Sequence, residues 1–325
     1  MPYRKYLRLL TPIDIATSIY IILTGIYILL GSDHLDKLYA NIAYRILFIS
    51  IICMLIYLYS VSGSKLVKFF RFFYPLAFLM YFYPETASIN NFIFKDLDPF
   101  IANIEVNIFG GYPSVWFSEY FPWKWFNEIM SFGYFSYFPL IFLFCYIIFK
   151  TSFKNFSFVI FVICMSFYLY YIIFIIFPVA GPQFFLAPPY NQLQDGYFFR
   201  SVMKVIEHYG EGPTAAFPSS HVGIITIVIF LVFKYKPTLM KWYLPISILL
   251  CLSTVYTKAH YVVDVIAGFL TAPVMYWISS QTYYFIFVGL KQENKIQYVL
   301  DNLKIFIRSV FDDQPVLYKN KHQKK

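Results

Sequence analysis

Residues 156–178, FSFVIFVICMSFYLYYIIFIIFP, form an uncharged apolar stretch in the middle of the chain. As a helix, this stretch is long enough to cross the roughly 30 Å hydrocarbon core of a bilayer. Similar runs recur toward both ends, the third and sixth being short, and the expected spans are residues 13–31, 43–61, 72–84, 132–149, 156–178, 222–235, 243–257 and 261–289. The runs are continuous rather than alternating, and only helices or closed barrels satisfy their own backbone in lipid. The sequence therefore predicts an all-α fold, a polytopic transmembrane helical bundle of about eight spans.

The composition excludes an ordinary soluble domain. Hydrophobic residues make up 59% of the chain and charged residues 13%, against about 45–50% and 25% in soluble domains. The four cysteines, at positions 53, 145, 164 and 251, fall inside expected spans at unrelated spacings. They therefore predict neither a disulfide framework nor a zinc site.

The distribution of charge gives an orientation. When alternate loops are assigned to two sides, most of the 26 lysines and arginines fall in one set together with both termini, whereas the acidic residues lean toward the other set. By the positive-inside rule, both termini are expected to be cytoplasmic. The net charge of +9 then reports topology and not nucleic-acid binding, so the expected partners are membrane lipids and no nucleic acid.

The domain organisation is expected to be simple. Residues 1–290 are predicted to form one membrane-embedded domain, followed by a basic cytoplasmic segment, residues 291–325. Within that segment, apolar residues recur at helical spacing from Ile296 to Val310, with basic residues on the other side. This pattern is typical of an amphipathic helix on anionic headgroups, and a helix packed on the cytoplasmic face of the bundle is an equal alternative.

Two long segments lie on the non-cytoplasmic side of this topology. Residues 85–130 are rich in aromatic side chains and are expected to form an interfacial belt of Trp and Tyr, with a platform for lipid entry as the alternative. Residues 179–217 contain several Gly and Pro turn signals. They are expected to fold over the outer surface as a lid or wall.

The segment TAAFPSSHVGI, residues 214–224, places polar groups at the outer mouth of the sixth expected span. Pro218 is expected to start the helix, and Ser219 or Ser220 to cap its unpaired amide groups. A helix N-terminus carries exposed N–H groups and attracts anions, so His221 would stand beside an anion site. The alternative is that the serines are ordinary caps and His221 an interfacial polar residue.

The segment STVYTKAHYVVD, residues 253–264, carries a second candidate group. His260 and Asp264 are four residues apart, share a helix face and lie on the same side of the predicted topology as His221. Such a carboxylate can hold one imidazole nitrogen as a donor and leave the other as a nucleophile, and Lys258 adds positive charge nearby. The alternatives are an interhelical hydrogen-bond pair, a proton relay and a metal site, but the ligands are too few for a metal and the spans hold almost no charge for a relay. A reaction at the outer leaflet fits better.

These segments resemble a known family. FPSSH followed by S-x6-H-x3-D resembles two signatures of the type 2 phosphatidic acid phosphatase and vanadium haloperoxidase superfamily, whose patterns are P-S-G-H and S-R-x5-H-x3-D, and the likeness covers about residues 180–270. Upstream, Asp98, FGGYP at 109–113 and YFSY at 134–137 resemble the bacterial branch related to inositolphosphorylceramide synthase. The expected phosphatase-like core thus spans about residues 95–285.

The resemblance implies a phosphohistidine mechanism that needs no metal and no cofactor. His260 would attack phosphorus, Asp264 would orient its ring, and His221 would protonate the departing alkoxide and then activate the acceptor. Charge on the phosphoryl oxygens would be stabilised by hydroxyls, backbone amides and cations. The side chains expected to bind phosphate are Ser219, Ser220, Lys258 and Arg200.

The identity of the acceptor separates two activities. Water gives a lipid phosphatase that hydrolyses a phosphomonoester or pyrophosphate, which is the function we expect. A lipid or inositol-type alcohol gives a phosphotransferase resembling inositolphosphorylceramide synthase, and a non-catalytic membrane protein that retains the motif is a further alternative. The active site is expected on the extracytoplasmic (periplasmic or lumenal) face.

Three positions depart from the family patterns. The arginine that follows the serine is Thr254 here, so Lys258 or Arg200 would have to bind the phosphate instead. The K-x6-R-P signature has no match with the right spacing, and the most similar residues, around Arg71, fall on the predicted cytoplasmic side. Ser220 stands where glycine is usual.

Overall fold

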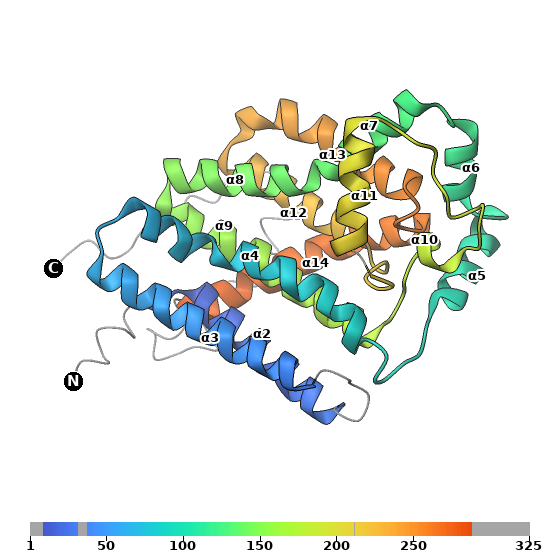
Figure 1. The fold of residues 1–325 in the computed structure, drawn as a ribbon. Coiled ribbons are helices and arrows are strands. Elements are labelled where there is room, and N and C mark those ends of the chain that lie inside the picture. Colours follow the sequence, from blue (N-terminus) through green and yellow to red (C-terminus); the bar gives the residue numbers. More distant parts are fainter. Residues whose placement is uncertain (1–8, 32–37, 211, 288–325) are drawn as a thin grey trace. The chain divides into compact units, whose positions relative to one another are not determined.

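The structure of the protein is a computed structural model that describes residues 9–31, 38–210 and 212–287 (Figure 1). Every regular element within these ranges is a helix, and the described residues contain no strand. The all-α prediction is therefore confirmed for this part of the chain.

The chain divides into two compact units, residues 1–279 and 280–325, and the candidate site lies in the first. The predicted amphipathic helix and tail, residues 291–325, lie outside the described residues. The long helices are α2 (Pro12–Leu30), α3 (Leu38–Val61), α4 (Lys65–Ile89), α8 (Tyr137–Thr151), α9 (Phe153–Ile176), α12 (Ser220–Tyr235), α13 (Met240–Tyr256) and α14 (Val262–Phe287). The shorter ones are α5 (Asp98–Phe109), α6 (Pro113–Tyr120), α7 (Lys124–Phe135), α10 (Pro182–Phe185), α11 (Phe198–Gly210) and the 3-10 helix η2 (Pro237–Leu239).

Seven helical stretches among the described residues are long and apolar enough to cross a membrane. They are α2, α3, α4, the stretch formed by α7 and α8, α9, the stretch formed by η2 and α13, and α14. The protein is therefore an integral membrane protein. The sixth expected span corresponds to α12, which is apolar but has 16 residues, fewer than the roughly 20 of a typical crossing.

The third expected span is longer in the structure than the apolar run 72–84. Helix α4 also takes in charged residues at both ends, and two of these form ion pairs with neighbouring helices. Arg71 forms a buried ion pair with Asp14 of α2 at 2.5 Å, and Glu85 forms one with Arg45 of α3 at 2.9 Å. Charged groups are tolerated inside an apolar bundle when they are paired, so α4 extends beyond its uncharged core.

Helix α9, which holds the uncharged stretch, positions the two helices of the candidate site. It packs against α2, α4, α8 and α12 and is buried over most of its length, as expected of a helix that is apolar on all sides. The Tyr170 hydroxyl of α9 shares a 2.9 Å hydrogen bond with Thr271 of α14. It also lies 1.9 Å from where a Cβ on Gly223 of α12 would stand, so the glycine allows α12 to approach α9.

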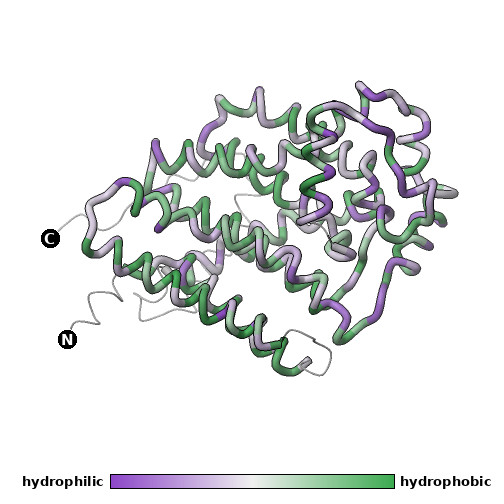
Figure 2. The backbone as a smooth tube through the Cα atoms, viewed as in Figure 1, coloured by the Kyte–Doolittle hydropathy of each residue, from purple (hydrophilic) through white to green (hydrophobic). Residues whose placement is uncertain are grey.

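The aromatic segment 85–130 forms the end of α4, then α5, α6 and the start of α7. Exposed aromatic side chains, among them Tyr120, Trp123 and Trp125, gather where α6 leads into α7, and the two indole rings stack at 5.7 Å. Hydrophobic residues run along the long helices, whereas hydrophilic residues are concentrated in the loops and short helices at the α5–α6 end (Figure 2).

Candidate active site

Helix α12 begins at Ser220, two residues before the expected apolar run, and Ser219 is its N-cap. The Ser219 hydroxyl accepts a hydrogen bond from the Val222 N–H, and the Ser219 N–H donates to the Asp264 carbonyl at 3.0 Å. The prediction that Pro218 starts the helix is wrong, because this tie to α14 holds Ser219 in a non-helical conformation and the helix begins at Ser220. The capping prediction is resolved in favour of Ser219.

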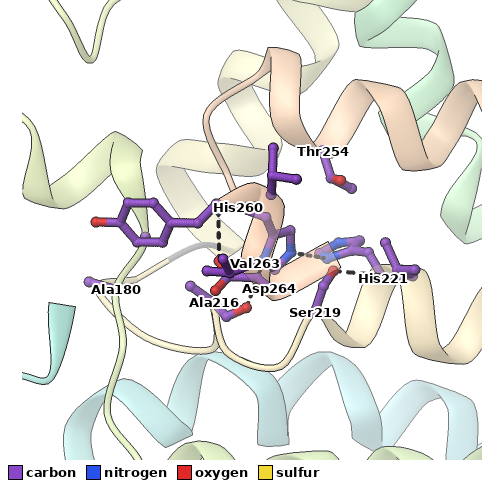
Figure 3. Close-up of polar contacts among 12 residues, drawn as sticks. Ala180, Ala216, Ser219, His221, Thr254, His260, Val263 and Asp264 are labelled. Atoms are coloured by element: carbon purple, nitrogen blue, oxygen red, sulfur yellow. Dashed lines mark hydrogen bonds and ion pairs between the residues drawn. The ribbon is translucent and has the colours of Figure 1, made fainter. Parts of the chain in front are cut away.

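The two histidines meet although they are far apart in sequence (Figure 3). His221 Nδ1 lies 3.2 Å from His260 Nε2, and both side chains are buried. His260 Nδ1 lies 2.8 Å from the Ala216 carbonyl oxygen, which can only accept. Nδ1 therefore carries the proton, and in the neutral ring Nε2 presents its lone pair toward His221.

Asp264 lies beside this pair, but its contact differs from the prediction. Its Oδ2 is 3.6 Å from His260 Nδ1, beyond hydrogen-bond distance, and accepts a hydrogen bond from the Tyr261 N–H at 2.7 Å. The predicted contact between the carboxylate and the ring is therefore an ion pair and not a hydrogen bond, because the Ala216 carbonyl accepts the hydrogen bond from Nδ1. At 3.6 Å the carboxylate still stabilises a positive charge on His260 by a direct electrostatic interaction.

Two tyrosine rings pack against the side chain of His221. The rings of Tyr134 and Tyr137 lie 4.8 and 4.5 Å from its ring centroid. Tyr134 also packs with Met203 of α11 and with Ala259, the residue before His260, in a buried cluster. Within the segment 179–217, for which a lid or wall over the outer surface is predicted, Met203 thus packs against residues next to both histidine-bearing parts of the chain.

Sequence reasoning missed a carboxylate that fixes the start of α14. Both oxygens of Glu105 accept hydrogen bonds, from the N–H groups of Val262 and Val263 at 2.9 and 3.0 Å. These are two of the amides that the first turn of a helix leaves unpaired, and the next residue is Asp264. Burial raises the pKa of Glu105, while the two hydrogen bonds oppose the shift.

Asp98, also on α5, fixes the chain at Ala180 and Gly181 and contacts Tyr261, the residue before α14. It accepts hydrogen bonds from the N–H groups of Ala180 and Gly181 and from the Tyr261 hydroxyl at 3.2 Å. Burial raises the pKa of Asp98 to about 6 against the effect of the Ala180 hydrogen bond. Asp98 and Glu105 are seven residues apart on α5, so their shared helix face was the signal in the sequence that could have linked them.

Gly181 shows how tightly this loop is packed. Its φ of +93° lies in a region that residues with a Cβ rarely adopt. A Cβ there would also stand 2.6 Å from the Ala259 carbonyl oxygen and 3.1 Å from the Ala216 Cβ. The backbone behind His260 therefore leaves no room for a larger residue at this position.

The predicted phosphate-binding cations have protein partners. Lys258 Nζ donates to the Gln192 carbonyl, and burial lowers the pKa of Lys258 to about 8. Arg200 forms a 2.5 Å ion pair with Glu207 and lines a polar cavity of about 340 Å³ that Thr257 also lines. The structure thus brings together His221, His260, Asp264 and Ser219, while the side chains of Lys258 and Arg200 point to Gln192 and Glu207.

Thr254 does not replace the family's arginine chemically. Its hydroxyl donates to the Cys251 carbonyl of its own helix at 2.8 Å, and its carbonyl accepts the His260 N–H at 3.1 Å. The residue therefore orients the backbone of His260. Among the described residues, no group of three or more His, Cys, Asp or Glu side chains has the arrangement of a metal site.

Comparison with known proteins identifies the family. No curated protein and no solved structure matches the chain. The model of the PAP2 superfamily matches residues 109–278, about half of the chain, which include both histidines and Asp264. The match does not single out the branch related to inositolphosphorylceramide synthase. The matched region covers about half of the chain, and the two sequence motifs within it supply the histidine pair. The chain therefore belongs to the PAP2 superfamily.

Proposed function

We propose that the protein is a membrane lipid phosphatase that hydrolyses a phosphomonoester or pyrophosphate through a phosphohistidine at His260, on the extracytoplasmic face. Membership of the PAP2 superfamily indicates an activity of the phosphatase or phosphotransferase type. The observation that carries the proposal is the 3.2 Å approach of His221 Nδ1 to His260 Nε2, with Ala216 fixing the tautomer of His260.

In the first half-reaction, His260 Nε2 forms a bond to phosphorus while the bond from phosphorus to the ester oxygen breaks. The bound anionic phosphate favours the imidazolium form of His221, which gives its proton to the departing alkoxide. The phosphoryl group enters between the two rings, so His221 moves away from Nε2. Asp264, close to Nδ1, stabilises the positive charge that the phosphorylated ring acquires.

In the second half-reaction, neutral His221 takes a proton from water, whose oxygen attacks phosphorus as the bond to Nε2 breaks. Inorganic phosphate leaves and both rings return to their starting state. Throughout, negative charge builds up on the phosphoryl oxygens. We assign the Ser219 hydroxyl, the amide and hydroxyl of Ser220 at the start of α12, and the cation of Lys258, once it leaves the Gln192 carbonyl, to stabilise it.

The assignment of Lys258 predicts a pH effect on substrate binding. Because burial lowers the pKa of Lys258 to about 8, the side chain is cationic below that pH and loses its charge above it. We expect KM for a phosphate ester to rise as the pH passes about 8. In Lys258→Arg, whose guanidinium stays charged, this rise should be absent, and a steady-state series of KM against pH in both proteins checks it. An identical rise in both would remove Lys258 from the phosphate site.

Glu105 predicts a second effect, through positioning. In Glu105→Gln one hydrogen-bond acceptor at the start of α14 becomes a donor that faces an N–H group, so we expect a loss of about 0.5–2 kcal/mol in the free energy of unfolding and a fall in kcat of about 10-fold or more, because His260 and Asp264 shift. KM for a soluble ester should change little. A fall in stability with unchanged kcat would mean that Glu105 is only structural.

A phosphotransferase is the second candidate, and the polar cavity favours it. Its lining offers hydrogen-bond donors and acceptors from Gln183, Asn191, Arg200 and Glu207, and the buried Arg200 Nε has no hydrogen-bond partner among the described residues. Such a lining suits a polyhydroxylated alcohol as the acceptor.

The test is a product analysis of purified protein with a set of lipid phosphates, with and without inositol and other alcohols. Free phosphate in every condition supports the phosphatase. A phosphomonoester of the added alcohol, formed only when that alcohol is present, supports the transferase. Absence of turnover with every phosphate ester, including chainless ones, would contradict both and favour a non-catalytic protein.

A further inference from the structure

An apolar groove of about 580 Å³ runs along one face of α13, between α12 and α14. On α13 it is lined by Leu244, Ser247, Cys251 and Val255, whose spacing follows one helix face. Together with the proposed function, on which this inference rests, the geometry points to a single hydrocarbon chain of the substrate lipid as the occupant of this groove.

One end of the groove lies beside the helix ends that carry the catalytic pair, although neither histidine is part of its lining. Val255 and Val262 flank the loop that carries His260, and Ile225, also in the lining, lies one turn beyond His221 on α12. A chain attached to a phosphate between the histidines therefore enters the groove at this end.

The length of the groove fits one leaflet. From Val255 to Leu244 the lining extends over eleven steps along the helix, about 16 Å at 1.5 Å per residue. This is about half of the roughly 30 Å hydrocarbon core. A chain that starts at a headgroup on one face of the bilayer would end near the other end of the groove.

The groove is open to lipid along its side. Several of its lining residues are about half exposed, namely Leu244 at 45%, Ile248 at 54%, Leu252 at 48% and Phe269 at 47%. It is thus continuous with the lipid-facing surface of the spans, and a chain can enter sideways without leaving hydrocarbon. An ordinary bilayer lipid could occupy the same space, but its presence would not couple the groove to turnover.

A kinetic test measures that coupling. In Cys251→Trp, a large ring fills the middle of the groove, so a long chain is displaced and its phosphate is misplaced at the histidines. We expect kcat/KM for long-chain phosphatidate in vesicles to fall about 10-fold or more relative to kcat/KM for chainless phenyl phosphate. The matched control is Ile266→Trp, a half-exposed position on α14 outside the groove, which should leave this ratio as in the wild type. Equal ratios in all three folded proteins would overturn the inference.

A second measurement needs neither turnover nor a groove variant. A phosphatidate with a photoreactive group near the end of its chain is bound to His260→Ala and irradiated, and the labelled residues are mapped by mass spectrometry. We expect labels concentrated between Leu244 and Val255, displaced by excess unlabelled phosphatidate. Labels spread evenly over exposed residues of all spans would overturn the inference. Failure of the proposed function is distinguishable, because it would abolish turnover of phenyl phosphate as well.

Discussion

In His260→Ala we expect phosphate release to fall by at least about 10²–10⁴-fold, because the atom that forms the bond to phosphorus is gone. We expect this loss of activity to be the largest caused by any single substitution, because Nε2 of His260 faces His221 and its Nδ1 is fixed at 2.8 Å from the Ala216 carbonyl. The measurement is the rate of phosphate release from a lipid phosphate by the purified variant, with its thermal unfolding midpoint recorded beside the wild type.

His260→Asn is the matched variant. Its side-chain amide can still donate to the Ala216 carbonyl, so it retains the packing of the loop while lacking the nucleophile. We expect it to be as inactive as His260→Ala and closer to wild type in stability. Substantial phosphate release by either folded variant would mean that another group attacks phosphorus.

In His221→Ala the expected loss depends on the leaving group. A lipid alkoxide needs a proton to depart, so turnover should again fall by about 10²–10⁴-fold. A nitrophenolate leaves without one, so phosphorylation by nitrophenyl phosphate should be much less affected. Because the base that activates water is also missing, the phosphorylated His260 should accumulate.

The measurement is a rapid-quench experiment in which nitrophenolate release and the mass of the intact chain are followed together. We expect a burst of nitrophenolate and a matching phosphoryl adduct on His260. Equal losses for both leaving groups, without an adduct, would exclude His221 from proton transfer.

The fold was predictable because the bilayer imposes a simple rule on sequence. Long apolar runs gave the helices in order, and the failures lie where other contacts decide. The extent of α4 depends on ion pairs with Asp14 and Arg45, which belong to distant parts of the sequence, and the start of α12 depends on a backbone bond from Ser219 to Asp264. Neither partner can be inferred from local composition.

The candidate site was predictable only in its side chains. The two motifs placed His221 and His260 together, and the structure brings them within 3.2 Å. The group that holds His260 Nδ1 was assigned to Asp264 but is the Ala216 carbonyl, because a backbone carbonyl leaves no mark in a sequence. Glu105 was missed because its role depends on how α5 packs against α14, not on its neighbours along the chain.

The stereochemical course at phosphorus tests the central claim, two successive displacements through His260, most directly. A phosphorothioate ester made chiral at phosphorus with two oxygen isotopes is hydrolysed in water that carries the third isotope, and the configuration of the released thiophosphate is determined. Each in-line displacement inverts phosphorus, so passage through a phosphohistidine predicts overall retention. Overall inversion would mean that water attacks the substrate directly, and the phosphohistidine mechanism would be contradicted.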